Sequence, residues 1–377
     1  MITVLLAAWQ GAAYIEEQLD SILRQKGIGS ASKESEVSES REPGIRIFIS
    51  DDGSTDGTGE ILEQYKERYP EQIRLVHRSP ERKEKDQADG IPPAAGNFFW
   101  LLSECCKALE DEEKCKNQNG GQYVMLSDQD DVWKEQKAAK LLAEMKRLEK
   151  QYGEDHPILV HSDMEVADAN LKTIHPSFFK YQKCSPSRTS FSEILVENSV
   201  TGGAVMMNRA LLMLFKERPA ACFMHDWWIA LAASCFGTIA WVKESLYLYR
   251  QHGNNTLGAK KSGNLKAIAE RIGQIFGKKA MKNDGSQEVG NIAGGSAQVE
   301  ENYRKMAAQA HAFGKLYGEQ MSEGQKATLR AYLALRYQSP LGRLKNVLKN
   351  RFFKNSWIQT LAQCVTIPRP DGENRPV

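Results

Sequence analysis

The chain has 377 residues, enough for one large domain with an appendage or for two domains. Its formal net charge of +2 gives no overall attraction to nucleic acid, and a hydrophobic content of 41% is ordinary for a globular protein. Seven cysteines without a CxxC pair favour neither a disulfide framework nor a zinc knuckle. Reduced thiols in the cytoplasm are the simplest interpretation.

The N-terminus starts directly on the apolar segment Ile2–Ala8, without a basic start or a cleavage site. We therefore expect no signal peptide. No apolar run approaches the roughly 20 residues of a membrane-spanning helix. A cytoplasmic protein is predicted, with attachment to the inner face of the cell membrane left open.

Apolar strands alternate with amphipathic helices through the first 160 residues. This alternation predicts an α/β fold with a mostly parallel, Rossmann-like central sheet and flanking helices. Three polar inserts, at 29–44, 79–95 and 110–121, are predicted to be surface loops. Strands are expected at 2–8, 45–50, 72–77, 122–127 and 157–162, and helices at 14–26, 57–69, 96–109 and 133–151.

The pattern changes after residue 185 and becomes helical towards the C-terminus. We expect a domain at 1–256, a Gly- and Ser-containing linker at 257–298, and a helical C-terminal region at 299–377. The expected elements here are a helix near 208–216, a helix at 227–236, strands at 238–243 and 245–250, and helices at 299–318, 322–338 and 340–363.

Three carboxylates end the fourth predicted strand: Asp128, Asp130 and Asp131. Carboxylates repel one another and resist burial, so a hard divalent cation is one explanation for crowding them. The carboxyl ends of strands are also where open α/β sheets bind ligands. A solvated turn with an Asp cap, before a helix starting near Trp133, explains the pattern equally well.

A second acidic pair, Asp51 and Asp52, ends the second predicted strand. Helix capping by Ser54, Thr55 or Asp56 could explain half of this junction. Two acidic strand ends in one sheet are harder to dismiss. If both strands converge at the switch point of the sheet, their carboxylates line one crevice.

Eight short motifs follow one another over residues 2–255. They are Ala7-Ala-Trp-Gln-Gly11, Tyr14-Ile-Glu-Glu-Gln-Leu-Asp-Ser-Ile22, Ser50-Asp-Asp-Gly-Ser-Thr-Asp56, Gly96-Asn-Phe98, Ser127-Asp-Gln-Asp-Asp-Val-Trp133, Thr201-Gly-Gly203, His225-Asp-Trp-Trp228 and Tyr249-Arg-Gln-His-Gly-Asn-Asn255. In these motifs and in their order the chain resembles the family 2 glycosyltransferases of the GT-A type. Its details are also similar to bacterial rhamnosyltransferase-like members that build surface polysaccharide.

The resemblance implies a role for each matching residue. The donor nucleotide is expected to contact Ala8, Trp9, Asp51, Asp52, Asn97 and Asp128. The metal, Mg²⁺ or Mn²⁺, is expected to be held among Asp128, Asp130, Asp131 and His252. Asp226 matches the family's catalytic base. The run Ala7–Gln10 departs from the Thr-Tyr-Asn-like run of many relatives, which puts the base contacts of this strand in doubt.

Four further residues are candidates for the acceptor or the transferred sugar. Thr201, Gly202 and Gly203 offer backbone N–H groups or form a close-packed bend, and Trp227 packs against a sugar or in the core. Trp228 is expected in the core. Asp226 also fits a helix cap, and His252 an ordinary loop residue.

The implied activity is inverting transfer of a sugar from a nucleoside-diphosphate donor to a hydroxyl of a glycan or lipid-linked acceptor. A metal neutralises the leaving diphosphate, and a carboxylate on the opposite face takes the proton of the acceptor. A nucleotidyltransferase is an alternative, although Trp9–Ala13 lacks a basic residue for phosphate. A non-catalytic nucleotide-sugar-binding protein is another. The absence of a GxGxxG motif after the first strand disfavours a dinucleotide oxidoreductase.

The predicted helix at 340–363 interleaves apolar residues with Arg343, Lys345, Lys349, Arg351 and Lys354. Such a helix either lies on an anionic membrane or packs on the rest of the protein with its cations solvated.

Overall fold

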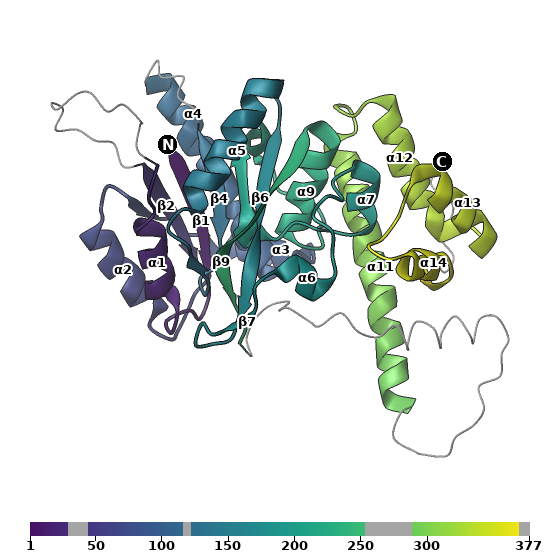
Figure 1. Ribbon diagram of the computed structural model, residues 1–377, viewed down its shortest axis with the longest axis horizontal. Coiled ribbons are helices and arrows are strands. Elements are labelled where there is room, and N and C mark those ends of the chain that lie inside the picture. The colour runs from purple at the N-terminus through teal and green to yellow at the C-terminus, as the bar shows by residue number, and fades with distance from the viewer. Residues whose placement is uncertain (29–43, 116–121, 253–288, 369–377) are drawn as a thin grey trace. The chain divides into compact units, whose positions relative to one another are not determined.

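A computed structural model of the protein describes residues 1–28, 44–115, 122–252 and 289–368 (Figure 1). The chain divides into two compact units. Nearly all of the predicted insert at 29–44 and most of the predicted linker at 257–298 lie outside the described residues. Unit 1 comprises Met1–Gln182, Val200–Arg218 and Met224–Lys260, and unit 2 comprises Lys183–Ser199, Pro219–Phe223 and Lys261–Val377.

Unit 1 is built on a nine-stranded sheet with the order β3-β2-β1-β4-β8-β6-β9-β5, to which β7 adds by pairing with β6. The two strands expected at 238–250 form one continuous strand, β9. The strands are β1 (Ile2–Ala8), β2 (Ile45–Asp51), β3 (Ile73–Leu75), β4 (Tyr123–Ser127), β5 (Val132–Trp133), β6 (Ile158–Ala167), β7 (Thr173–His175), β8 (Val205–Asn208) and β9 (Thr238–Arg250).

The first four strands in the order, β3 to β4, are mutually parallel, as the sequence predicts. The remainder of the sheet is mixed, because β8 runs antiparallel to both β4 and β6 while β6 and β9 are parallel. The predicted α/β class is therefore confirmed, with a mixed sheet whose four adjacent parallel strands come from the N-terminal third of the chain.

Helices cover both faces of the sheet. The helices of unit 1 are α1 (Ile15–Leu23), α2 (Thr58–Arg68), α3 (Pro80–Ala88), α4 (Pro93–Cys115), α5 (Lys137–Tyr152), α6 (Phe178–Gln182), α8 (Arg209–Leu212) and α9 (His225–Phe236), with short 3₁₀ turns at Gly202–Ala204 and Met213–Phe215. Alternate residues of β1, such as Val4 and Leu6, join a buried core with α1, α2 and α5, and α4 packs against the same strand. Strand periodicity thus gives both faces of β1 an apolar partner.

Two polar segments predicted as loops are helical. Helix α3 occupies part of the predicted loop at 79–95; Ser79 caps it by accepting a hydrogen bond from the Arg82 N–H, and Pro80 follows at its first position. Helix α4 extends to Cys115, into the predicted loop at 110–121. The helix expected from residue 133 instead begins at Lys137, because Val132 and Trp133 pair with β9 as a short strand.

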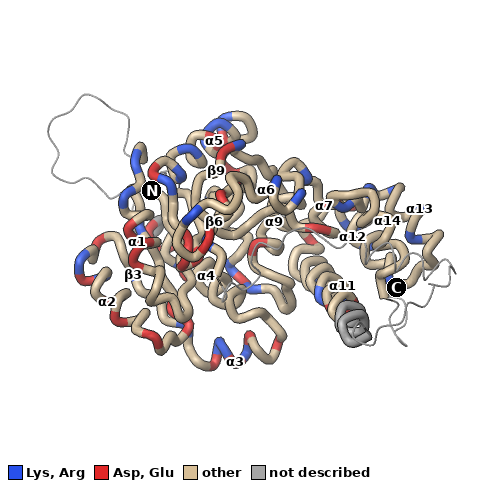
Figure 2. The backbone as a smooth tube through the Cα atoms, turned by 60° about the horizontal axis from the view of Figure 1, so that its bottom comes forward, with Lys and Arg blue, Asp and Glu red and all other residues tan. Residues whose placement is uncertain are grey.

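Unit 2 is helical. It contains α7 (Phe191–Val196), α11 (Val289–Tyr317), α12 (Glu323–Ala334), a 3₁₀ turn (Leu335–Tyr337), α13 (Pro340–Asn350) and α14 (Trp357–Thr366). The single helix predicted at 340–363 is wrong: Arg351 adopts a left-handed conformation with φ 59° and ends α13, and Ser356 caps a separate helix. Lys and Arg, but no Asp or Glu, occur on α13 (Figure 2).

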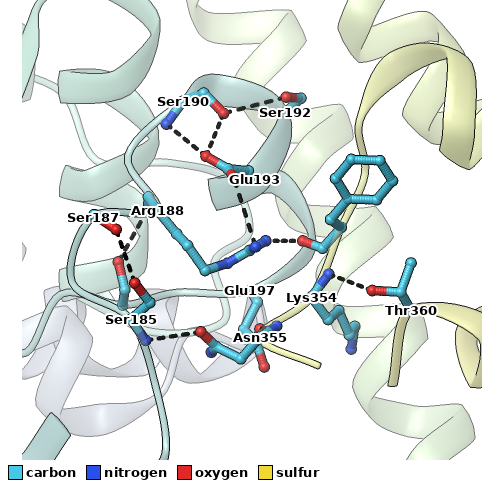
Figure 3. Close-up of polar contacts among 12 residues, drawn as sticks. Ser185, Ser187, Arg188, Ser190, Ser192, Glu193, Glu197, Lys354, Asn355 and Thr360 are labelled. Atoms are coloured by element: carbon cyan, nitrogen blue, oxygen red, sulfur yellow. Dashed lines mark hydrogen bonds and ion pairs between the residues drawn. The ribbon is translucent and has the colours of Figure 1, made fainter. Parts of the chain in front are cut away.

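A polar cluster joins the α7 segment to the loop between α13 and α14 (Figure 3). Arg188 donates to the carbonyl oxygen of Phe353 and pairs with Glu193. The Asn355 side chain accepts from the Ser185 N–H at 2.8 Å, while the Asn355 N–H donates to Glu197 at 2.6 Å. Residues 183–199 are therefore part of the helical unit. The predicted domain boundaries at 256 and 299 remain a proposal.

Across the described parts of the chain, none of the helices combines the length and the apolar character needed to cross a membrane.

Candidate active site

The parallel register brings the two acidic strand ends to one edge of the sheet. Ala8, the last residue of β1, lies opposite Asp51 at the end of β2, and Leu6 lies opposite Ser127 at the end of β4. Because β1 lies between β2 and β4, the polypeptide leaves all three strands on the same side. The convergence that the sequence predicts for Asp51, Asp52 and Asp128 is therefore present.

The loop after β1 presents an exposed indole in a fixed backbone. Trp9 is 60% exposed, while its N–H donates to the Gln129 side chain at 2.5 Å and its carbonyl accepts from the same amide at 2.6 Å. Gln10 adopts a left-handed φ of 51° and its N–H donates to Ser54. A Cβ at Gly11 would lie 2.8 Å from Gln129, so this glycine permits the close approach. The loop can offer Trp9 to a planar base with little ordering cost.

The two carboxylates at the end of β2 have different partners. Asp51 accepts from the N–H and hydroxyl of Ser54 at 3.0 and 2.5 Å, so it fixes the turn. Asp52 lies 3.1 Å from Lys83 Nζ and 3.5 Å from Arg78. Lys83 escaped the sequence analysis because helix α3 was predicted as a loop, and Arg78 lies just before this helix. The Ser79-Pro80 start of that helix was the signal that could have identified it.

Asn97 holds the end of β2 from helix α4. Its side-chain amide donates to the Ser50 carbonyl at 2.9 Å, and the residue is 2% exposed. Its side-chain oxygen is buried without a hydrogen-bond partner among the described residues. This oxygen is available to a donor group of a ligand.

Asp128, Asp130 and Asp131 are brought together but differ in environment. Burial and the neighbouring Asp130 and Asp226 raise the pKa of Asp128 to about 7. Asp131 is 1% exposed and accepts from the Arg250 N–H at 3.1 Å. Burial and its two acidic neighbours raise the pKa of Asp131 well above its ordinary range. The mutual repulsion is the condition that a cation would relieve.

A buried lysine lies beneath this cluster. Lys137 is 0% exposed, and its Nζ donates to the Gly203 carbonyl at 2.5 Å and lies 3.8 and 4.1 Å from the ring centroids of Trp133 and Tyr247. Burial lowers its pKa, which Asp131 and Asp128 oppose. Lys137 is the first residue of α5, and lysine is unfavourable at this positive end of a helix. Its position was the signal in the sequence that could have identified it as a functional residue.

His252 and Asp130 meet from distant parts of the chain. His252 Nε2 lies 2.7 Å from the Asp130 carboxylate, and its ring stacks on Tyr14 at 4.8 Å. Arg250 fixes the same turn, since its guanidinium donates to the Asp130 carbonyl at 2.7 Å and to Glu17 at 2.5 Å. The structure thus brings His252 to the acidic cluster. The sequence alone had left open whether His252 is a site residue or an ordinary loop residue.

Asp226 lies in the first turn of α9 and close to the cluster. It accepts the N–H of Trp227 at 2.6 Å and also that of Gly202. Burial raises the pKa of Asp226 to about 7, against which these N–H groups act. A carboxylate with a pKa near neutrality is suited to general base chemistry.

The Thr201–Gly203 segment lies between the Asp128–Asp131 cluster and the start of α9, which carries Asp226. A Cβ at Gly203 would lie 3.3 Å from Asp131 and 3.5 Å from Asp128, and one at Gly202 would lie 2.6 Å from His225. Both glycines are therefore needed for close packing, as one of the two sequence interpretations has it. Trp228 is fully buried as expected, and Trp227 is 8% exposed, so only an edge of its ring can reach a ligand.

The arrangement of carboxylates fits a metal ion whose coordination is completed by a substrate. Among the residues that the structure describes, no group of three or more His, Cys, Asp and Glu side chains is placed to hold an ion alone. Asp128 and Asp130 supply two repelling carboxylates, and Mg²⁺ is usually bound through one or two carboxylates plus substrate phosphates. Asp131 already has Arg250 and Lys137 as neighbours, and His252 already contacts Asp130.

His225 gives the folded state a measurable pH dependence. It is 6% exposed and stacks on Phe98 at 3.9 Å, and burial lowers its pKa to about 3. Between the unfolded value near 6.5 and about 3, only the unfolded chain takes the proton. Its contribution to stability is therefore complete above pH 6.5 and is lost as the pH falls, by about 1.4 kcal/mol per unit.

Denaturant unfolding from pH 5 to 7.5 tests this contribution. The pH dependence should become shallower in His225→Gln by roughly that slope, whereas His77→Gln, at an exposed histidine, should retain it. Parallel curves for wild type and His225→Gln would show that the folded state accepts the proton.

Comparisons with known proteins agree with the sequence resemblance. Residues 3–103 match the family model "Glycosyl transferase family 2". The chain is 27% identical over 282 residues to dTDP-rhamnosyl transferase RfbG of Shigella flexneri, covering 72% of this chain and 80% of that protein. It is 24% identical over 260 residues to the uncharacterized glycosyltransferase alr2836 of Nostoc sp., covering 67% and 66%.

Among solved structures, residues 1–349 of S. aureus TarS in complex with UDP-GlcNAc are 14% identical. That alignment covers 96% of this chain and 90% of the other, with a TM-score of 0.45. Mannosyltransferase PcManGT from Pyrobaculum calidifontis in complex with GDP-Man and Mn²⁺ is 17% identical, covers 97% and 85%, and has a TM-score of 0.41.

Proposed function

We propose, from the match of residues 3–103 to the glycosyl transferase family 2 model and the likeness to the Shigella rhamnosyl transferase, that this chain moves a sugar from a nucleoside-diphosphate donor to an acceptor hydroxyl with inversion. One observation carries the proposal. Gly202 donates its N–H to Asp226, the candidate base, while a Cβ on the next residue, Gly203, would lie 3.5 Å from Asp128 at the end of β4. The candidate proton acceptor and the candidate donor-binding carboxylates therefore lie against the same pair of glycines, which supports a displacement from opposite sides.

The nucleotide is proposed to occupy the edge formed by β1 and β2. Trp9 offers a stacking surface, and Asp52 with its neighbours Arg78 and Lys83 offers both an acceptor and donors to the edge of a base. Asn97 contributes its buried side-chain oxygen. The contacts of Asp51 within the turn indicate that it supports Asp52.

The diphosphate is proposed to lie over Asp128 and Asp130, with Asp131 and His252 supporting these residues. A Mg²⁺ or Mn²⁺ held there would neutralise the charge that develops on the leaving diphosphate. Lys137 balances one of the three carboxylates from below, which leaves a formal charge of about −2 for one divalent ion to meet.

The acceptor is proposed to bind beside Asp226, with Thr201, Gly202 and Gly203 shaping the approach. The carboxylate takes the hydroxyl proton as the oxygen attacks the anomeric carbon from the face opposite the diphosphate. Trp227 can border this position by one edge of its ring. We propose a glycan or a lipid-linked saccharide as the acceptor and, from the name of the Shigella relative, a rhamnosyl donor in surface polysaccharide synthesis.

A donor-release assay tests the proposal. Purified protein is incubated with dTDP-rhamnose or another nucleotide sugar, with Mn²⁺ or with chelator, and the released nucleotide is identified. Metal-dependent release of nucleoside diphosphate is the expected result. A nucleotidyltransferase would instead release pyrophosphate in a parallel incubation with a nucleoside triphosphate and a sugar 1-phosphate. Donor binding seen by thermal shift without any release would favour a non-catalytic nucleotide-sugar-binding protein.

A further inference from the structure

Five large apolar side chains are exposed within one short stretch of unit 2. Leu341 and Leu348 on α13 are 74% and 50% exposed, and Trp357, Ile358 and Leu361 on α14 are 64%, 45% and 49% exposed. They make up five of the nine exposed large hydrophobic residues among the described residues. Such clustering differs from the isolated exposed apolar residues that any surface carries.

These side chains are not needed for the packing of their own helices. Val347 on α13 is 0% exposed, and Ala362 and Cys364 on α14 are 6% and 5% exposed, so each helix already buries another side in unit 2. The two helices also pack against each other. Each helix therefore has a packed apolar side and, in addition, exposed apolar residues.

The same stretch is strictly basic. Residues 324–370 contain no Asp or Glu. Lys345, Lys349 and Arg351 are exposed beside the two leucines of α13, and Figure 2 shows Lys and Arg on this helix without an acidic residue. The net charge of the whole chain, +2, conceals this local excess.

We propose that the exposed residues of α13 and α14 dock unit 2 onto the surface of an anionic membrane. Leucine, isoleucine and tryptophan side chains enter the boundary between headgroups and acyl chains, while lysine and arginine pair with anionic lipid. Trp357 fits the depth at which indole rings collect in bilayers. Two short helices lie in the interface and do not span it, which agrees with their lengths.

The charge argues against a second copy of this chain as the occupant. Self-association through this surface would bring like charges together across the contact. Nucleic acid would match the charge but would leave the exposed aliphatic residues without an apolar environment. An anionic bilayer satisfies both properties at once. The inference concerns a surface of unit 2 and does not depend on the proposed reaction.

Vesicle co-sedimentation of the full-length protein tests the inference. The protein should bind vesicles of phosphatidylglycerol and phosphatidylcholine, bind pure phosphatidylcholine far more weakly, and dissociate in high salt. Replacing Trp357, Ile358 and Leu361 by Ser should weaken binding about tenfold or more, and Lys345→Gln with Lys349→Gln and Arg351→Gln should do the same.

Ile174→Ser is the matched control, since Ile174 is 52% exposed on β7 in unit 1. It should bind vesicles like wild type, and unchanged thermal midpoints would show that every variant is folded. Equal vesicle binding by wild type and both patch variants would overturn the inference, as would the absence of binding to anionic vesicles. A dimer seen by light scattering, lost in the apolar variant, would assign the surface to a second copy instead.

Discussion

Replacing Asp226 by Asn should lower the rate of sugar transfer by about 10²–10⁴-fold and leave donor affinity unchanged. The amide oxygen of Asn can still accept the N–H groups of Trp227 and Gly202, so the start of α9 is preserved. What is lost is the ability to take the hydroxyl proton. Single-turnover transfer and calorimetric donor titration, measured on one preparation, separate the two effects.

The pH profile provides a second measurement of the same group. Burial raises the pKa of Asp226 to about 7, and a base works only when deprotonated. The wild-type rate should therefore rise as the pH increases through about 7 and level off above it. Asp155→Asn, at an exposed carboxylate, should keep both the rate and this profile. A wild-type rate in Asp226→Asn would reject the base assignment.

Replacing Asp130 by Asn should weaken metal-dependent binding of nucleoside diphosphate by about 10–100-fold, a range typical even for outer partners of metal ligands. Asp130 is proposed to face the ion and also contacts His252 at 2.7 Å. An amide retains one contact with the histidine but loses the negative charge. Calorimetry with nucleoside diphosphate in Mn²⁺ and in chelator measures the difference directly.

Asp131→Asn separates metal binding from folding in this experiment. Asp131 is buried with Lys137 and the Arg250 N–H, so its substitution should lower the free energy of unfolding more than Asp130→Asn does. Unfolding in urea gives that comparison. If Asp130→Asn bound nucleoside diphosphate and Mn²⁺ as wild type does, the carboxylate could not be a ligand of the ion.

The strand ends could be predicted because local pattern alone determines them. The apolar runs Ile2–Ala8 and Tyr123–Ser127 stop at polar residues, and parallel pairing aligns their ends. Contacts distant in sequence could not be inferred in this way. The 2.7 Å approach of His252 to Asp130 spans 122 positions, and no local pattern encodes it.

Helix α3 shows the limit of periodicity as a signal. Its segment is strongly charged and buries only Asp86, so no apolar stripe marks it. The cap at Ser79 and the proline after it stabilise the start of the helix, although the helix has no apolar stripe. The same limit concealed Lys83, one of the two cations beside Asp52. Arg351 illustrates the reverse, because a left-handed residue divides a stretch whose apolar pattern is continuous.

The discontinuity of unit 2 has a consequence for synthesis on the ribosome. Phe191, in the α7 segment, packs against Phe313 of α11 with ring centroids 5.8 Å apart. More than a hundred residues separate them in the chain, on the order of ten seconds of translation. During that interval the apolar residues of α7 lack this partner. The nascent chain therefore passes through a stage in which the apolar residues of α7 are exposed, between two stretches of sequence that belong to unit 1. A holding chaperone would bind the chain at this stage.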